Sequence, residues 1–402
     1  MRPFTSTISI DEARRRLAAN IRPVERFDWL PLDAAAGRVA AADVQATTFV
    51  PPFSRSAMDG YAVLAADTAG ATVDSPVRLR LAERIYTGQT PTIPVTPGRC
   101  SEIATGAPLP EGADAVVMVE ETTRADEGTI EIRAQAAPGQ NIGRRGGDIS
   151  PGDVIVRSGD LLNPSRVGAL AAIGVNEVQV FARPRVAVLS TGNEVVLPGV
   201  ELRPSQIYDV NRFTLGAVIE AHGGSAEPRD PVPDTIEDLE DALDSCADAD
   251  IVVFSGGSSV GERDLILDLV ARRGEMIFHG IAVKPGKPTA FARIGRTAFF
   301  GMPGNPTSCL SNAYILLVPY LRATARLPLY PPRVITARLS RRIVSQANRH
   351  HFFTVRLEGG QAVPSFKTSG DITSLSKADG YIEIPADQTV VEEGAEVQVT
   401  IF

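Results

Sequence analysis

Residues 251–264 read IVVFSGGSSVGERD, residues 279–291 read HGIAVKPGKPTAF, and residues 299–310 read FFGMPGNPTSCL. In each stretch an apolar run leads into a loop that is rich in Gly, Pro, Ser or Lys. The run Ile251–Phe254 has the length and the β-branching of a buried strand. Residues 264–273 and the residues after Pro306 have helical patterns, the first closed by Gly274. This alternation predicts a mostly parallel α/β sheet with helices on its faces.

The loops of this stretch predict an anion site. Ligands of such sheets bind beyond the carboxyl ends of the strands, where glycines let backbone N–H groups approach an anion. Lys284 and Lys287 add positive charge, and Asp264 is a candidate metal ligand. Taken singly, the Gly-Gly-Ser-Ser loop would be an ordinary turn, Lys284 and Lys287 would be solvated side chains, and Asp264 would be a helix N-cap. Together they indicate a phosphorylated or oxyanionic ligand with a divalent cation.

The composition bounds the class of protein. A chain of 402 residues suggests two to four domains, and its apolar share of 44% is that of a globular protein. The net charge of −8 argues against nucleic-acid binding. Three widely spaced cysteines fit neither a disulfide framework nor a zinc site and indicate a reducing cytosol. No signal peptide and no apolar run of about 20 residues is found, so we expect a soluble protein without a membrane contact.

Changes in composition and residue pattern along the chain predict four domains. Residues 1–47 and 146–181 form a discontinuous N-terminal domain, which includes a helix over residues 9–21 that opens with the capping box Ser9–Glu12. Residues 48–145 form an inserted β-rich domain. Residues 182–327 form the α/β domain, and residues 333–402 alternate apolar and polar side chains, as a small β domain does.

Further loops carry crowded polar side chains. The segment 51–62 reads PPFSRSAMDGYA and contains Asp59, the segment 103–114 contains Thr105, and the segment 139–152 contains Asp148. In the α/β domain Glu194 follows the first strand. Asp234 is expected to cap the helix that carries Ile236 and Leu239. Such loops often carry function, although a structural Asp-Gly turn explains Asp59 equally well.

These motifs, in this order, resemble those of the MoeA family of molybdopterin molybdenumtransferases, which is related to the C-terminal domain of gephyrin. The resemblance runs through Pro51–Val63, Thr105–Glu120, Pro138–Asp148, Ser190–Glu194, Ser255–Asp264, Lys284–Pro288, Pro303–Pro306 and Ser369–Gly380. It implies α/β and β domains with a small C-terminal β-barrel, in a homodimer whose active site takes residues from both chains. It also implies a cytoplasmic enzyme that takes adenylylated molybdopterin and molybdate, with Mg²⁺, and releases AMP. An adenylyltransferase would supply the substrate.

The resemblance also assigns residues. Catalytic residues would be Asp59, Thr105, Asp148, Glu194 and Asp264, the first three reaching in from the other chain. The metal would be held by Glu194, Asp234 and Asp264. Substrate would contact Ser255, Gly256, Gly257, Ser259, Lys284, Gly286, Lys287, Pro303, Asn305, Arg349 and Ser374.

The chain departs from the family pattern at Glu102, Gly143, Gly147, Ser258 and Thr354. Several of these changes remove charge near the expected cleft. A catalytically weak paralogue, a tungstate-handling enzyme and a gephyrin-like scaffold protein therefore remain alternatives. The retained Lys and Asp residues at strand ends favour the enzyme.

Overall fold

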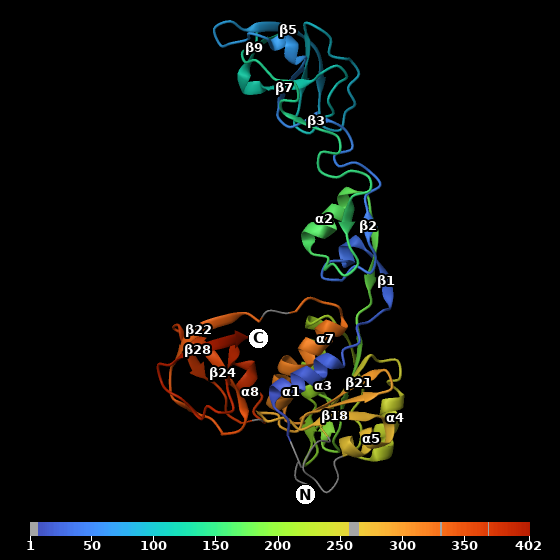
Figure 1. The fold of residues 1–402 in the computed structure, drawn as a ribbon, viewed down its shortest axis with the longest axis vertical. Coiled ribbons are helices and arrows are strands. Elements are labelled where there is room, and N and C mark those ends of the chain that lie inside the picture. Colours follow the sequence, from blue (N-terminus) through green and yellow to red (C-terminus); the bar gives the residue numbers. More distant parts are fainter. Residues whose placement is uncertain (1–6, 257–264, 330–331, 369) are drawn as a thin grey trace. The chain divides into compact units, whose positions relative to one another are not determined.

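The computed structural model describes residues 7–256, 265–329, 332–368 and 370–402. The chain forms two compact units (Figure 1). The first contains the chain up to Asp28 and from Val180 to Phe402, and the second contains Trp29–Gln179.

A six-stranded sheet is the centre of the first unit. Its strand order is β16-β13-β17-β21-β20-β18. The pairs β13–β16, β13–β17 and β17–β21 are parallel, whereas β20 and β18 are added antiparallel. The expected mostly parallel α/β sheet is therefore confirmed, with an antiparallel edge. The strands of this domain are β13 (Arg185–Ser190), β14 (Val195–Val196), β15 (Ile207–Tyr208), β16 (Ser225–Pro228), β17 (Ile251–Ser255), β18 (Glu275–His279), β19 (Val283–Lys284), β20 (Ala290–Ile294) and β21 (Thr297–Met302).

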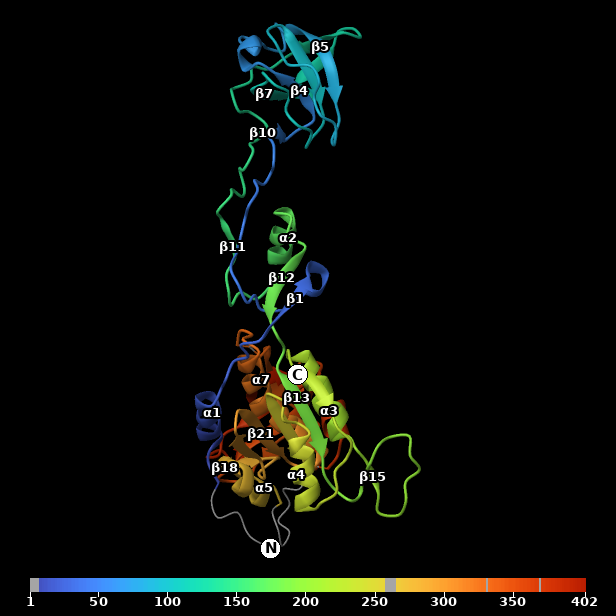
Figure 2. The ribbon, with the colours of Figure 1, turned by 90° about the vertical axis from the view of Figure 1, so that its right-hand side faces the viewer.

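Helices cover both faces of this sheet, because the side chains of a strand alternate between the faces. On one face Val186, Val188 and Phe300 pack on α1, α3 and the helical segment after Pro306. On the other face Ala187 and Phe254 pack on α4 and α5 (Figures 1 and 2). The helices are α1 (Ile10–Ala19), α3 (Asn211–Ala221), α4 (Ile236–Asp244), α5 (Leu265–Arg273), α6 (Pro306–Asn312), the π-helical turn η4 (Ala313–Leu317) and α7 (Val318–Thr324).

Helix α1 confirms the predicted capping box, since Ser9 Oγ accepts a hydrogen bond from the Glu12 N–H at 3.2 Å. Its place in the fold differs from the expectation. We grouped residues 1–47 with 146–181, but Ile10, Ala13 and Leu17 are buried in the core of the α/β domain. Their apolar stripe completes that core, which the sequence pattern alone did not reveal.

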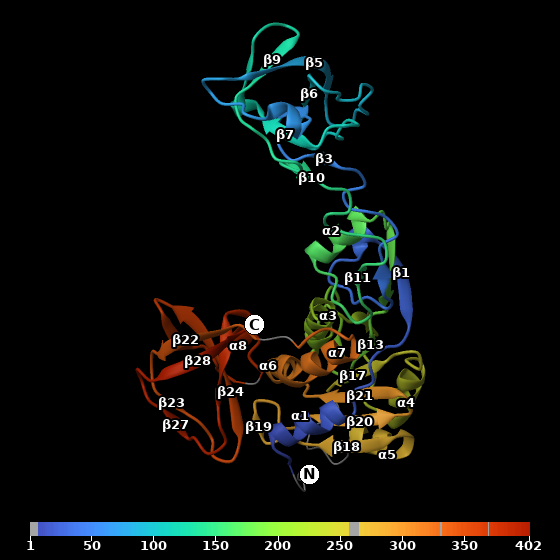
Figure 3. The ribbon, with the colours of Figure 1, turned by 45° about the horizontal axis from the view of Figure 1, so that its top comes forward.

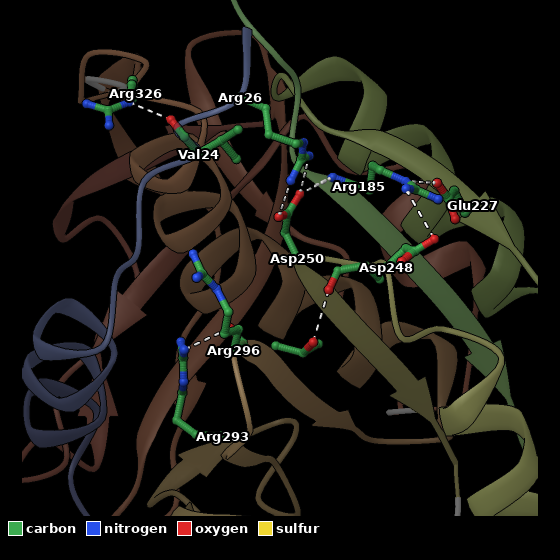
Figure 4. Close-up of polar contacts among 11 residues, drawn as sticks. Val24, Arg26, Arg185, Glu227, Asp248, Asp250, Arg293, Arg296 and Arg326 are labelled. Carbon is green, nitrogen blue, oxygen red and sulfur yellow. Dashed lines mark hydrogen bonds and ion pairs between the residues drawn. The ribbon is translucent and has the colours of Figure 1, made fainter.

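Ion pairs hold the following segment at the amino ends of the parallel strands (Figure 4). Both terminal nitrogens of Arg26 donate to the Asp250 carboxylate at 2.9 Å. The same carboxylate accepts the Arg185 N–H at 2.8 Å, and the Arg185 side chain donates to Glu227 at 2.7 Å. This bidentate pairing fixes the chain beside β13 and β17.

Two local features need tertiary explanations. The apolar run before the lysine loop breaks at Gly280, and β19 leaves the sheet to pair with β24 of the C-terminal domain. Helix α5 ends at Arg273 as predicted, but Gly274 does not adopt a left-handed conformation. A side chain there would collide with the Arg293 carbonyl, so close packing and not capping explains this glycine.

Residues 333–402 form a small closed β-barrel (Figure 3). The sheet order is β19-β24-β25-β22-β28-β26, and the additional pair β24–β26 closes it. Its core includes Leu339, Val355 and Val399. The elements are β22 (Val334–Leu339), β23 (Ile343–Val344), β24 (His350–Glu358), β25 (Gln361–Pro364), α8 (Thr373–Ser376), β26 (Gly380–Ile384), β27 (Val390–Val391) and β28 (Glu396–Ile401).

The second unit contains a curled six-stranded sheet with the order β7-β4-β6-β5-β9-β8. Tyr61, Val63, Val117 and Ile130 are in its core. The elements from the start of β1 onward are β1 (Phe27–Pro31), η1 (Leu32–Ala34), β2 (Val44–Gln45), β3 (Arg55–Ser56), β4 (Gly60–Val63), η2 (Ala65–Thr68), β5 (Val77–Ile85), β6 (Arg99–Ile103), β7 (Ala115–Met118), η3 (Val119–Glu121), β8 (Thr122–Arg124), β9 (Thr129–Ile132), β10 (Ile142–Gly143), β11 (Val154–Val156), α2 (Pro164–Ala172) and β12 (Glu177–Phe181).

Candidate functional site

The carboxyl ends of three parallel strands meet at one edge of the α/β sheet. Ser190 of β13 is in register with Ser255 of β17, and Ser255 is in register with Met302 of β21. The hydroxyls of Ser190 and Ser255 are 3.2 Å apart and buried. The loops that follow these strands therefore start side by side, as the sequence predicted.

A cavity of about 1440 Å³ lies at this edge. Ten of the predicted residues line it, from the α/β domain and from the C-terminal barrel. They are Glu194, Asp234, Ser255, Gly256, Lys284, Gly286, Lys287, Pro303, Asn305 and Arg349. Such a volume exceeds that of most small-ligand pockets.

Two carboxylates occupy one part of the wall. Asp234 is partly buried, and this burial raises the pKa of its carboxyl group. The nearby Thr191 hydroxyl acts in the opposite direction, and the negative charge of Glu194 raises the pKa further. Asp234 is not the helix cap that we expected, because Thr235 Oγ accepts the Asp238 N–H at 3.1 Å. Its carboxylate therefore remains on the cavity wall beside that of Glu194.

The lysine loop is held from behind by one buried side chain. Asn312 Nδ2 donates to the Gly286 carbonyl at 2.9 Å and to Thr289 Oγ1 at 2.5 Å. Thr289 Oγ1 also donates to the Gly286 carbonyl at 2.9 Å. Lys284 is fixed on its other side by the pairing of β19 with β24, where it lies opposite His351. The positions of both lysines in the wall are thus set by tertiary contacts.

The C-terminal barrel contributes cations to the same cavity. Arg349 and Lys367 line it beside Phe366 and Thr368. Ser374, which we expected to contact substrate, is completely buried, and its Oγ accepts the Lys367 N–H at 3.1 Å. Its observed role is to hold the segment that carries Lys367.

Three predicted residues belong to the second compact unit. The Asp59 carboxylate accepts the Thr105 N–H at 2.7 Å and the Thr105 hydroxyl at 2.9 Å. These two hydrogen bonds, the backbone one first, lower the pKa of Asp59. Asp148 is exposed on the segment after β10. Asp59 and Thr105 thus form one rigid polar corner.

Three other predicted residues, Gly257, Ser259 and Asp264, lie outside the described residues, as does Ser258. Among the residues that the structure does describe, no group of three or more His, Cys, Asp or Glu side chains is arranged to hold a metal ion. Of the predicted metal ligands, Glu194 and Asp234 lie in the described wall, which Asp209, Glu237 and Asp268 also line.

Sequence reasoning missed several residues of the wall. Tyr208, Asp209 and Asn211 line the cavity from the start of α3, and Lys367 lines it from the barrel. The adjacent polar residues before a helix could have indicated Asp209 and Asn211. No sequence signal indicated Lys367, because only the docking of the barrel brings this residue to the α/β domain.

Four of the departures, Glu102, Gly143, Gly147 and Thr354, lie in the described residues, and two of them have local explanations. Glu102 is paired with Arg84 at 3.1 Å and with Arg124 at 3.0 Å, so its charge is compensated. Thr354 is buried in the barrel.

Three family models match successive parts of the chain. The "MoeA N-terminal region (domain I and II)" matches residues 8–174, the "Probable molybdopterin binding domain" matches residues 187–323, and the "MoeA C-terminal region (domain IV)" matches residues 336–402. Molybdopterin molybdenumtransferase 2 from Mycobacterium tuberculosis is 36% identical over 97% of this chain and 98% of its own length. The chain belongs to the MoeA family.

Other members agree with this assignment. Molybdopterin molybdenumtransferase from Haemophilus influenzae is 33% identical over 98% of both chains. A crystal structure of a molybdopterin biosynthesis MoeA protein from Pyrococcus horikoshii is 39% identical and covers 98% of this chain and 99% of its own, with a TM-score of 0.85. A second structure from that organism gives a TM-score of 0.82 at 30% identity and covers 99% of this chain. Within the described ranges, no helix is long and apolar enough to cross a membrane.

Proposed function

We propose that this MoeA-family chain is a molybdopterin molybdenumtransferase of molybdenum cofactor biosynthesis. More specifically, we propose that it inserts molybdenum from molybdate into adenylylated molybdopterin and releases AMP. One observation carries the proposal: a single cavity combines several carboxylates, Glu194 and Asp234 among them, with the cationic side chains Lys284, Lys287 and Arg349. A pyrophosphate linkage and a molybdate ion both need such anion contacts.

The wall is compatible with a magnesium ion. Mg²⁺ usually takes one or two protein carboxylates and completes its shell with water and substrate phosphate oxygens. Burial, with a smaller contribution from the negative charge of Glu194, raises the pKa of Asp234. These two carboxylates would hold the ion. When bound, it would neutralise negative charge on the phosphate oxygens.

The remaining residues act by positioning and charge. Lys284 and Lys287 bind anionic oxygens, and the buried Asn312 keeps their loop in place. Ser255 and Gly256 present the end of β17 and its following backbone to the ligand. None of the described wall residues is an obvious covalent nucleophile, so catalysis rests on orientation and electrostatic stabilisation.

We further propose that the active enzyme is a homodimer. The polar corner of Asp59 and Thr105, with Asp148, would complete each site from the second copy. The motif resemblance is the support for this arrangement. We also propose that an adenylyltransferase supplies the adenylylated substrate and that both proteins are cytoplasmic.

The test uses the purified full-length protein with adenylylated molybdopterin, molybdate and Mg²⁺. We expect stoichiometric AMP release together with molybdenum in the pterin product, and we expect neither when Mg²⁺ is removed with a chelator. Lys284→Ala should weaken substrate binding roughly tenfold to a hundredfold, the value of one charged contact. A wild-type protein that binds the substrate but releases no AMP would reject the transferase and favour the scaffold alternative.

A further inference from the structure

The start of α3 places two unsatisfied acceptors in the cavity wall. Asp209 is 4% exposed and Asn211 is 7% exposed, and both line the cavity. Asp209 Oδ2 and Asn211 Oδ1 are buried, and no donor from the described part of the chain reaches either oxygen. Buried acceptors without a donor are costly, so a ligand or a water molecule is expected to satisfy them.

Hydrogen bonds at the other polar atoms of these side chains fix their orientation. Asp209 Oδ1 accepts the Arg212 N–H at 3.0 Å, and the Asp209 N–H donates to the Val196 carbonyl at 2.8 Å. Asn211 Nδ2 donates to the Gly304 carbonyl at 2.8 Å. Asn211 Oδ1 is therefore assigned as the acceptor, because the amide nitrogen has a carbonyl partner.

An aromatic residue, Tyr208, directly precedes Asp209 in the chain and lines the same cavity. Tyr208 lines the cavity and is 40% exposed, although its hydroxyl donates to the Val200 carbonyl at 2.9 Å. That hydrogen bond restrains the ring against the segment that precedes β15, which projects from the domain in Figure 2. A restrained and accessible ring is a suitable surface for stacking a planar heterocycle.

We propose that Tyr208, Asp209 and Asn211 form the subsite for the heterocycle of the substrate, and that this heterocycle is the pterin. The proposal deepens the proposed function and rests on it. A pterin has a ring N–H directly beside an exocyclic amino group, so one edge offers two donors to the two acceptors. Adenine has a ring acceptor on each side of its amino group and would face Asp209 and Asn211 with acceptor against acceptor. Guanine shares the donor edge of the pterin.

The test is equilibrium binding of 6-hydroxymethylpterin, AMP and GMP to the full-length protein, followed by pterin fluorescence and by calorimetry. Asp209→Asn keeps an oxygen for the Arg212 N–H but presents an amide NH₂ where Oδ2 was. We expect it to weaken pterin binding roughly tenfold to a hundredfold and to leave AMP binding unchanged. Asp268→Asn is the matched control, because Asp268 also lines the cavity and the same charge is lost.

Several results would overturn the proposal. These are equal losses for pterin and AMP, a loss for AMP alone, or unchanged pterin binding in Asp209→Asn. GMP binding as tightly as the pterin, with the same loss in this variant, would assign the subsite to guanine instead. A loss of Mg²⁺ affinity without a loss of pterin affinity would make Asp209 a metal ligand. Failure of the wild-type protein to bind pterin at all would instead contradict the proposed function.

A second pair of variants keeps the test independent of the stability of Asp209→Asn. Tyr208→Leu should weaken pterin binding several-fold through lost stacking. Phe213→Leu is its control, since Phe213 is 54% exposed near the start of α3 and does not line the cavity. Equal pterin affinity in these two variants would remove Tyr208 from the subsite and reject the proposal.

Discussion

Replacing Gly286 by alanine tests how the lysine loop is held. Gly286 has a φ of +100°, a region that side-chain-bearing residues rarely adopt, and it is buried against Asn312. A β-carbon at this position would collide with the amide group of Asn312. That amide group donates to the Gly286 carbonyl and to Thr289 Oγ1, so it cannot move without breaking these hydrogen bonds.

The expected destabilisation has two parts. Backbone strain contributes roughly 1–3 kcal/mol. Displacing Asn312 breaks two buried hydrogen bonds, worth about 1 kcal/mol each. We therefore expect Gly286→Ala to lower the free energy of unfolding by about 3–5 kcal/mol, measured by urea denaturation. It should also weaken AMP binding, because Lys284 and Lys287 shift with the loop.

Gly295→Ala is the matched control. Gly295 also has a positive φ, +59°, but nothing lies within 4 Å of the position of an added β-carbon. It should show only strain, about 1–2 kcal/mol, and normal AMP binding. Equal destabilisation by the two substitutions would refute the inference that Asn312 holds the lysine loop in place. In a double-mutant cycle, Asn312→Ala should make Gly286→Ala less costly than it is alone, because the collision is removed.

The other predictions concern charge, pH and assembly. Glu194→Gln and Asp234→Asn should each weaken Mg²⁺ binding about tenfold or more, by calorimetry, whereas unchanged affinity in both would place the ion elsewhere. Burial, followed by the charge of Lys284, lowers the pKa of His351 from 6.5 to about 4. Between about pH 4 and pH 6.5, His351 therefore binds a proton in the unfolded chain but not in the folded chain. Stability should fall by at most about 3 kcal/mol as the pH falls from about 6.5 to about 4, and His351→Asn should flatten this part of the profile. A doubly tagged heterodimer of Asp59→Asn and Glu194→Gln chains should regain about half of the wild-type rate per dimer, because one of its two sites is intact. An inactive heterodimer would reject a site shared between chains.

The sequence by itself determined the local elements and much of the α/β site. Ile251–Phe254 is a buried strand, the capping box begins α1, and the loops after β13, β17 and β21 meet at one edge. These features follow from short-range causes: side-chain periodicity, helix capping, and the rule that parallel strands place their carboxyl ends together. For the same reason Glu194, Ser255 and Lys284 could be assigned to one cavity before the structure was known.

Tertiary structure alone decided which distant segments complete that cavity. Lys367 enters the wall because β19 pairs with β24 and the barrel docks there, and α1 joins the α/β core and not the segment after residue 146. Ser374, which was predicted to contact substrate, instead supports the segment that carries Lys367. Asp209 and Asn211 became candidate ligand contacts only when each lacked a donor for one buried oxygen. Pairing between segments far apart in the chain and the satisfaction of buried polar atoms are properties of the packed molecule, and no local pattern encodes them.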